Sequence, residues 1–228
     1  MFRFALTAAV VSAFAGSAGA QTLFGPNPYL SFADSPFSGL SFNAFQLEDF
    51  EDGAFNTPGA TPSAGWVAIN GGQSGDSVDA DDGAIDGSGA FRQSYYSAQS
   101  QRSLTVTFDA VTFGQFPTHA GLVWTDVGAV DSGLDGFASV TFEGFGPGGV
   151  ALGSVIAFPL GDGSVTGGTA EDRFFGFESL SGIESIRISV PSSADWEVDH
   201  IQYGVVPSPA VGMVFAGLAC WPGARRRR

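Results

Sequence analysis

Short apolar runs that alternate with polar residues are the feature that most restricts how this chain can fold. Within the segments 103–110, 137–145 and 183–190, apolar side chains alternate with polar ones at 104, 106 and 108, at 140 and 142, and at 186, 188 and 190. A period of two is typical of a β-strand with one buried face, and no long segment repeats apolar residues at helical spacing. Further strands are expected at 66–69, 90–96, 120–125, 150–158, 173–177 and 196–203.

Glycine and aspartate separate these runs and mark turns, because glycine adopts positive φ without strain and aspartate caps turns through its side chain. These turn signals lie at 70–72, 82–83, 86–87, 135–136, 146–149 and 162–163. About ten short strands joined by such turns predict an all-β fold, an antiparallel β-sandwich of jelly-roll type. The 22 phenylalanines are expected to fill the space between its sheets.

The first twenty residues have the three parts of a secretory signal peptide and are expected to form a signal helix. Arg3 supplies the positive start, residues 4–14 are apolar, and Ala18 and Ala20 fit a cleavage site before Gln21. Residues 21–41 are rich in proline and serine, which predicts a loosely ordered lead-in. Residues 42–204 then form one β-sandwich domain, and residues 205–228 form a separate C-terminal tail.

Charge is divided sharply along the chain. All nine basic residues are arginines, and only four of them lie between residues 21 and 204, against all 23 acids, which gives this segment a formal charge of −19. Such a body lacks the basic footprint that nucleic acids require, so no nucleic-acid partner is expected. The one cysteine, Cys220, lies in the tail, which excludes disulfides and a thiol nucleophile from the body.

The tail has three parts, namely a Val-Pro-Ser-Pro entry, an apolar run over 210–221 that is expected to form a short helix, and an arginine cluster. A membrane span needs about 20 apolar residues, so the run is short for a stable anchor. This layout resembles the PEP-CTERM sorting architecture, with Ser208 in place of the family's usual glutamate. The residues that carry the motif are Val206, Pro207, Ser208, Pro209, Arg225, Arg226, Arg227 and Arg228.

The resemblance implies that an exosortase-like processing enzyme removes the tail and that the body reaches the cell surface or the extracellular matrix. Family members often belong to bacteria that make exopolysaccharide or biofilm. Contact with the membrane is then expected only through the tail before processing. The alternative is a C-terminal membrane anchor that stays in place.

Two segments of the body are similar to galactose-binding-like jelly rolls. The stretch 47–66 resembles the first strand and loop of that fold, and 195–204 resembles its closing strand. In carbohydrate-binding modules of this fold, acids of the first and last strands share a structural calcium ion. The resemblance therefore implies a calcium site made by Glu51 or Asp52 together with Asp199.

The acidic residues by themselves also favour calcium, which takes six to eight oxygen ligands from flexible loops. Candidate ligands gather at 48–52 and at 76–86, although neither stretch has the spacing of an EF-hand. The alternative is that these acids are solvated turn residues.

Catalytic patterns are absent from the sequence, so a non-enzyme is expected. His119 and His200 are the only histidines, which excludes a three-histidine zinc site, and no G-x-S-x-G or phosphate-binding loop occurs. Strict alternation would place His200 on the same face as Trp196 and Val198.

Aromatic side chains that stack on sugars are the remaining candidates for ligand binding. Trp66, Tyr95 and Tyr96 are the best placed of them, and the two adjacent tyrosines must face opposite ways. The alternative is that these rings belong to the core.

These observations predict an exported, non-catalytic β-sandwich of the cell envelope or surface. A calcium-dependent carbohydrate-binding module for exopolysaccharide and an unrecognised surface hydrolase are the alternatives.

Overall fold

The computed structural model describes residues 21–68, 76–80, 93–97, 101–127, 139–158, 160, 171–191 and 193–207. The expected signal helix, the apolar helix of the tail, and the motif residues Ser208, Pro209 and Arg225 to Arg228 lie outside this part of the chain. Among the described residues, no helix is long and apolar enough to span a bilayer.

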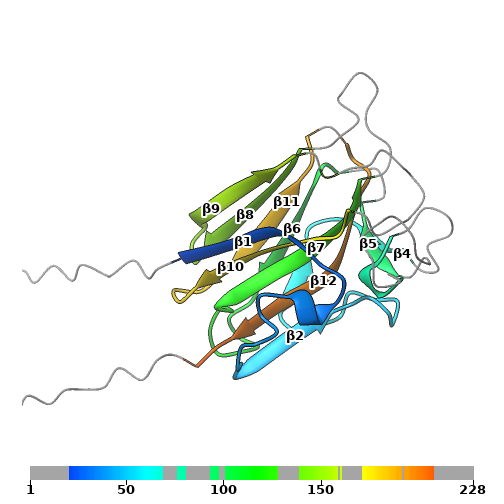
Figure 1. Ribbon diagram of the computed structural model, residues 1–228. Helices are drawn as coiled ribbons and strands as arrows, with labels where there is room; N and C mark the ends of the chain where they lie inside the picture. The colour runs from blue at the N-terminus through cyan, green and yellow to red at the C-terminus, as the bar shows by residue number, and fades with distance from the viewer. Residues whose placement is uncertain are drawn as a thin grey trace, which may run out of the picture.

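Two antiparallel sheets, packed face to face, make up the described part of the chain (Figure 1). The larger sheet has the order β1-β10-β7-β12-β5-β4, and β2 pairs with the other half of β12. Its strands are β1 (Gln21–Pro28), β2 (Ala44–Glu48), β4 (Trp66–Ala68), β5 (Ser94–Tyr96), β7 (His119–Val127), β10 (Arg173–Ser179) and β12 (Trp196–Val205).

The smaller sheet has the order β3-β6-β11-β8-β9. Its strands are β3 (Ala60–Pro62), β6 (Ser103–Phe108), β8 (Val140–Gly146), β9 (Val150–Ala157) and β11 (Ser185–Ser189). Two short 3₁₀ turns, η1 (Phe32–Asp34) and η2 (Val78–Ala80), complete the described elements.

The predicted all-β sandwich is confirmed, and the alternation of the sequence sets which side chains face inward. On β11, Ile186 and Ile188 are buried while Arg187 is only half-buried. Ile188 lies opposite Leu104 on β6 and opposite Phe142 on β8, so one face of three strands is apolar. A strand with this pattern has one stable register, because a shift of one residue would turn its isoleucines to water.

The segment 21–41 differs from the expected lead-in, because β1 is an ordered edge strand that pairs with β10 along its length. The pairing register shifts between Phe24 and Asn27, where Gly25 has a φ of 98°. This irregularity interrupts the alternation on which the prediction depends. The described part of the sandwich therefore includes the segment from Gln21 to Pro28.

Apolar residues form two layers, of which the sequence predicted one. The main cluster lies between the sheets and includes Trp124, Trp196, Phe142 and Phe177. A second cluster lies on the outer face of the larger sheet and consists of Tyr29, Phe37, Val78, Val123 and Phe174. The chain after β1 and the η2 turn supply three of these side chains, so the two segments cover the face that a simple sandwich would leave in water.

Glycine is required at position 121, where a neighbouring ring comes close to the backbone. A Cβ atom built on Gly121 would lie 2.5 Å from Cζ of Phe174 and 2.6 Å from the carbonyl oxygen of Phe175. The Phe174 ring can therefore pack flat on the sheet only because β7 has no side chain there.

We expect Gly121→Ala to lower the free energy of unfolding by about 1–3 kcal/mol, because the added methyl group overpacks a closed site. Thermal denaturation followed by circular dichroism measures the change. Gly39→Ala is the matched control, since no atom lies within 4 Å of its Cβ position. Equal melting temperatures for the two variants would contradict the packing argument.

Both ends of the sandwich leave it at one pole, which we call the terminal pole (Figure 1). Gln21 lies opposite Ser179 on β10. One residue further along, Glu178 lies opposite His119 on β7, and His119 lies opposite Gly204 on β12. The start of β1 and the end of β12 thus lie at the same end of the larger sheet, with β10 and β7 between them. The other pole, where β12 begins, is called the distal pole.

Candidate functional site

The candidate site is built on the middle strand β12, where a bulge brings polar residues to the covered outer face. Trp196 and Val198 point into the core, and the pairing with β7 shifts between Asp199 and Gln202. His200 occupies this shift with a φ of 43°. The bulge turns His200 away from the core, so the face predicted from strict alternation is wrong for this residue.

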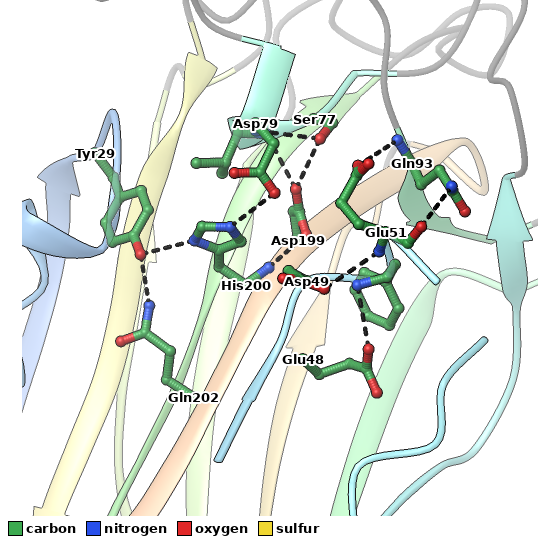
Figure 2. Close-up of polar contacts among 12 residues, drawn as sticks. Tyr29, Glu48, Asp49, Glu51, Ser77, Asp79, Gln93, Asp199, His200 and Gln202 are labelled. Carbon is green, nitrogen blue, oxygen red and sulfur yellow. Dashed lines mark hydrogen bonds and ion pairs between the residues drawn. The ribbon is translucent and has the colours of Figure 1, made fainter. Parts of the chain in front are cut away.

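His200 belongs to a chain of hydrogen bonds that crosses the outer face (Figure 2). Ser35 Oγ donates to Gln202 Oε1 at 2.6 Å, and Gln202 Nε2 donates to the Tyr29 hydroxyl at 2.8 Å. That hydroxyl lies 2.9 Å from His200 Nδ1, while His200 Nε2 lies 3.3 Å from Asp79 Oδ2. In the neutral ring Tyr29 then donates to Nδ1, and Nε2 carries the proton that Asp79 accepts.

Asp199 fixes the η2 segment to the sheet. Its Oδ2 accepts hydrogen bonds from the Ser77 hydroxyl and the Val78 backbone N–H, both at 3.0 Å. Its Oδ1 accepts from the backbone N–H of His200 at 2.7 Å. The carboxyl is completely buried, so these donors replace the water that it loses on folding.

Asp79, Asp199 and His200 are close enough together to be considered as metal ligands. However, His200 Nε2 is the atom that faces Asp79, and in the tautomer described above it carries a proton and cannot coordinate an ion. These three residues therefore fit a hydrogen-bonded network better than a metal centre.

A second group of acids lies beside this network and contains oxygen ligands alone. Glu197 lies directly opposite Asp126 on β7. Asp126, Glu171 and Glu197 are all buried, with exposed fractions of 7 %, 4 % and 3 %. Glu197 Oε2 accepts from the backbone N–H of Asp76 at 2.6 Å and from the Ser94 hydroxyl at 3.0 Å. We call Asp126, Glu171 and Glu197 the acidic triad.

Burial dominates the electrostatics of both groups. It raises the pKa of Glu197 and that of Asp199 to about 7 each. Burial, together with the neighbouring charges of Glu171 and Glu197, raises the pKa of Asp126 to about 10. Burial alone would lower the pKa of His200, but the hydrogen bond to Asp79 and the nearby carboxylates outweigh it and raise the pKa.

The predicted calcium ligands do not come together as the resemblance implied. Among the described residues, the side chains that could share a metal ion with Asp199 are those of Asp79 and His200. Neither Glu51 nor Asp52 belongs to that group. Glu51 Oε1 accepts from the Gln93 backbone at 3.2 Å, and Asp52 accepts within its own turn. Of the acids at 76–86, positions 81, 82 and 86 lie outside the described part of the chain.

The three candidate aromatic residues have different positions. Tyr95 is buried and stacks on Phe50 with ring centroids 5.3 Å apart, so it is a core residue and cannot bind a sugar. Tyr96 points the other way, as expected for adjacent strand residues. Trp66 is 58 % exposed and its ring centroid lies 6.2 Å from that of Tyr96.

Sequence reasoning missed the acidic triad because its members come from three distant segments. The one signal available in the sequence was Glu197. Alternation places its side chain on the face of the strand that points away from the core, whereas Trp196 and Val198 face the core. Nothing local indicated that this outer face is covered by residues 76–80.

Stability is expected to fall as the pH rises from 5 to 8. The pKa values of Glu197 and Asp199, about 7, exceed their ordinary values of 4.5 and 3.8, so the folded chain binds more protons than the unfolded chain in this window. Ionisation of the buried carboxyls then costs free energy, and about 1 kcal/mol moves the melting temperature by roughly 2–4 °C. Calorimetry at both pH values measures the difference.

In the same experiment Glu197→Gln should show a smaller decrease, because the amide oxygen still accepts the Asp76 N–H but does not ionise. Glu184→Gln, at an acid that accepts the Gly149 N–H at the surface, should keep the full decrease. A melting temperature that rises between pH 5 and pH 8 would refute the assignment.

Comparison with protein-family models, with curated proteins and with solved structures gives no match for this chain. Its function is therefore inferred from the residues and geometry described above.

Proposed function

We propose that this protein is a non-catalytic β-sandwich that is exported and sorted to the cell surface or extracellular matrix by its PEP-CTERM-like tail. The observation that carries the proposal is the terminal pole, where the residue after the leader and the residue before the tail leave the larger sheet at the same end, on strands separated by β10 and β7. The leader and the tail can then act during export without disturbing the two sheets. An exosortase-like enzyme can likewise cut the tail without disturbing them.

The junction between body and tail supports this interpretation. The Val206 backbone N–H donates to Thr118 Oγ1 at 3.1 Å, so β12 stays fixed to β7 up to the start of the motif. Pro207, the next residue, is exposed. A processing enzyme would thus meet an exposed Pro207 directly beyond the end of β12.

A non-catalytic role is supported by how deeply the carboxyls lie. A glycoside hydrolase needs two carboxyl groups in contact with the scissile bond. Glu197 and Asp126 lie opposite each other on β12 and β7 and are both buried, and Glu197 accepts the backbone N–H of Asp76. We therefore rank the hydrolase alternative below the non-catalytic proposal.

The mature form recovered from the cell surface is expected to begin at Gln21 and to end between Pro207 and Pro209. Mass spectrometry of the intact protein measures both ends. Deletion of Arg225 to Arg228 should leave an unprocessed chain in the membrane fraction, because the tail then lacks its cytoplasmic charge. A surface form that still ends at Arg228 would contradict removal and favour a retained anchor, and an intact chain in the cytosol would contradict export.

A calcium-dependent carbohydrate-binding module is the second candidate, and one row of residues favours it. Trp66 lies opposite Tyr96, which lies opposite Glu197, which in turn lies opposite Asp126. The exposed Trp66 and the half-buried Tyr96 therefore stand in the same cross-strand row as two members of the acidic triad. Stacked aromatic rings are a usual platform for sugars.

The donors of the acidic triad are of the kind that Ca²⁺ prefers, since all of them are carboxylate oxygens. Among the described residues, however, the ligand atoms that lie within 4.8 Å of one another belong to Asp79, Asp199 and His200, so the triad would have to draw closer around an ion. Asp126, Glu171 and Glu197 would hold the ion, which would offset the repulsion between their charges. As part of this second candidate function, we also propose that the body has a galactose-binding-like jelly-roll topology.

For this candidate we expect retention on exopolysaccharide in the presence of calcium and loss of retention with a chelator. Trp66→Ala should weaken retention at an unchanged melting temperature, because its ring is largely exposed. Asp126→Asn should abolish the stabilisation by calcium, measured as the shift in melting temperature, whereas Glu51→Gln should retain it. The opposite order for these two acids would restore the site predicted from the resemblance.

A further inference from the structure

Three exposed apolar side chains lie on the loops of the terminal pole. Val111 follows β6 and is 90 % exposed, Val150 begins β9 and is 62 % exposed, and Leu180 follows β10 and is 49 % exposed. We call these three side chains the apolar tips. A single apolar side chain at a protein surface is common, whereas a group of them on one face marks a surface that contacts another apolar phase.

The three loops form one surface, because hydrogen bonds join them. The Ile183 backbone N–H donates to the carbonyl of Pro117 at 2.8 Å, and the Glu184 N–H donates to the carbonyl of Phe145, also at 2.8 Å. The Glu184 carboxylate in turn accepts the Gly149 N–H at 3.0 Å. The loop between β10 and β11 therefore connects the loop that carries Val111 to the hairpin that carries Val150.

The same loops pack closely against one another. Gly182 has a φ of 96°, and a Cβ atom there would lie 2.9 Å from Cβ of Phe116 and 3.7 Å from Cγ of Pro147. Asp109 Oδ1 accepts the Val111 backbone N–H at 2.8 Å, which fixes the turn that presents this valine. The folded body thus holds the apolar tips in defined positions.

The tail leaves β12 beside these loops. Val206 donates its backbone N–H to Thr118 Oγ1, and Thr118 ends the loop that carries Val111. The apolar run of the tail begins at Ala210, four residues later. An extended chain spans at most about 14 Å over four residues, so an inserted tail would keep the terminal pole close to the bilayer.

The charges of the loops indicate how they would meet a membrane. The segments 109–118, 146–150 and 180–184 contain no lysine or arginine, and their acids are Asp109 and Glu184. Attraction to anionic headgroups is therefore excluded, and contact has to come from the apolar side chains.

We propose that the apolar tips rest on the bilayer surface while the tail is inserted, so that the terminal pole faces the membrane. This inference rests on the proposed function, because it requires the membrane-inserted state of the tail. An apolar face of the processing enzyme is the other possible occupant. The bilayer is favoured because the inserted tail itself brings it within reach of all three tips.

Fluorescence quenching in vesicles of phosphatidylcholine that contain nitroxide-labelled lipid tests the proposal, with the full chain and no processing enzyme. In a Cys220→Ser background, one fluorophore is attached through Val111→Cys, Val150→Cys, Leu180→Cys or Ile156→Cys. Flotation of the vesicles reports separately whether the tail is inserted.

Ile156 is the matched control for Val150, since both lie on β9 and are similarly exposed, at 68 % and 62 %. Ile156 pairs with Thr141, which pairs with Ser189 at the distal end of β11. Six residues of strand separate the two labels by about 20 Å. Quenching at each apolar tip should exceed that at position 156 by about threefold or more, because interfacial side chains enter only the outermost part of the bilayer.

A charge substitution separates contact through the tips from simple tethering by the tail. Val111→Asp together with Leu180→Asp should lower the quenching at position 150 by about half, because buried charge is costly at the apolar boundary. Ile156→Asp should leave it unchanged. Flotation and the melting temperature should stay the same in both variants, since these side chains are exposed.

Equal quenching at 150 and 156 in a chain that floats would overturn this inference and leave the proposed sorting function intact. Unchanged quenching in the double aspartate variant would do the same, as would stronger quenching in vesicles that contain phosphatidylglycerol. A chain that does not float would refute insertion of the tail and, with it, the contact proposed here.

Discussion

A carboxylate can be buried in a sheet only if other groups replace the water that it loses, and this requirement organises the outer face of the larger sheet. Glu197 and Asp199 lie on β12. Among the contacts described for these two carboxylates, none is to a lysine or an arginine. Backbone N–H groups of Asp76, Val78 and His200 supply the hydrogen bonds instead. The η2 segment is thus held on the sheet by the same acids that it covers.

This arrangement gives the protein an acidic interior that is poised for a proton or a cation. The raised pKa values of Glu197, Asp199 and Asp126 follow from burial first and from mutual repulsion second. Protonation relieves this cost, so pH acts on this structural element, and a divalent cation bound as proposed above would act on it as well. The Tyr29–His200–Asp79 chain extends this network to the chain after β1, which also covers the sheet.

The sequence predicts those parts of the fold that depend on local periodicity. Strands β6 and β11 and the first half of β8 alternate strictly, so their buried residues follow from the order of apolar and polar side chains alone. β1 could not be predicted in this way, because Gly25 interrupts its alternating pattern. The second apolar layer could not be predicted either, because Phe174 and Tyr29 are far apart in the sequence. The bulge at His200 defeats alternation for the residue most central to the candidate site.

The strand that carries the tail is also the most heavily paired strand described, with β7 on one side and β2 and β5 on the other. Hydrogen bonds in antiparallel sheets run perpendicular to the strands. A pull on the C-terminal end, directed along β12, would therefore load many of these bonds together in shear rather than open them one by one. If a membrane holds the tail, as proposed above, the sandwich would bear the resulting tension along β12.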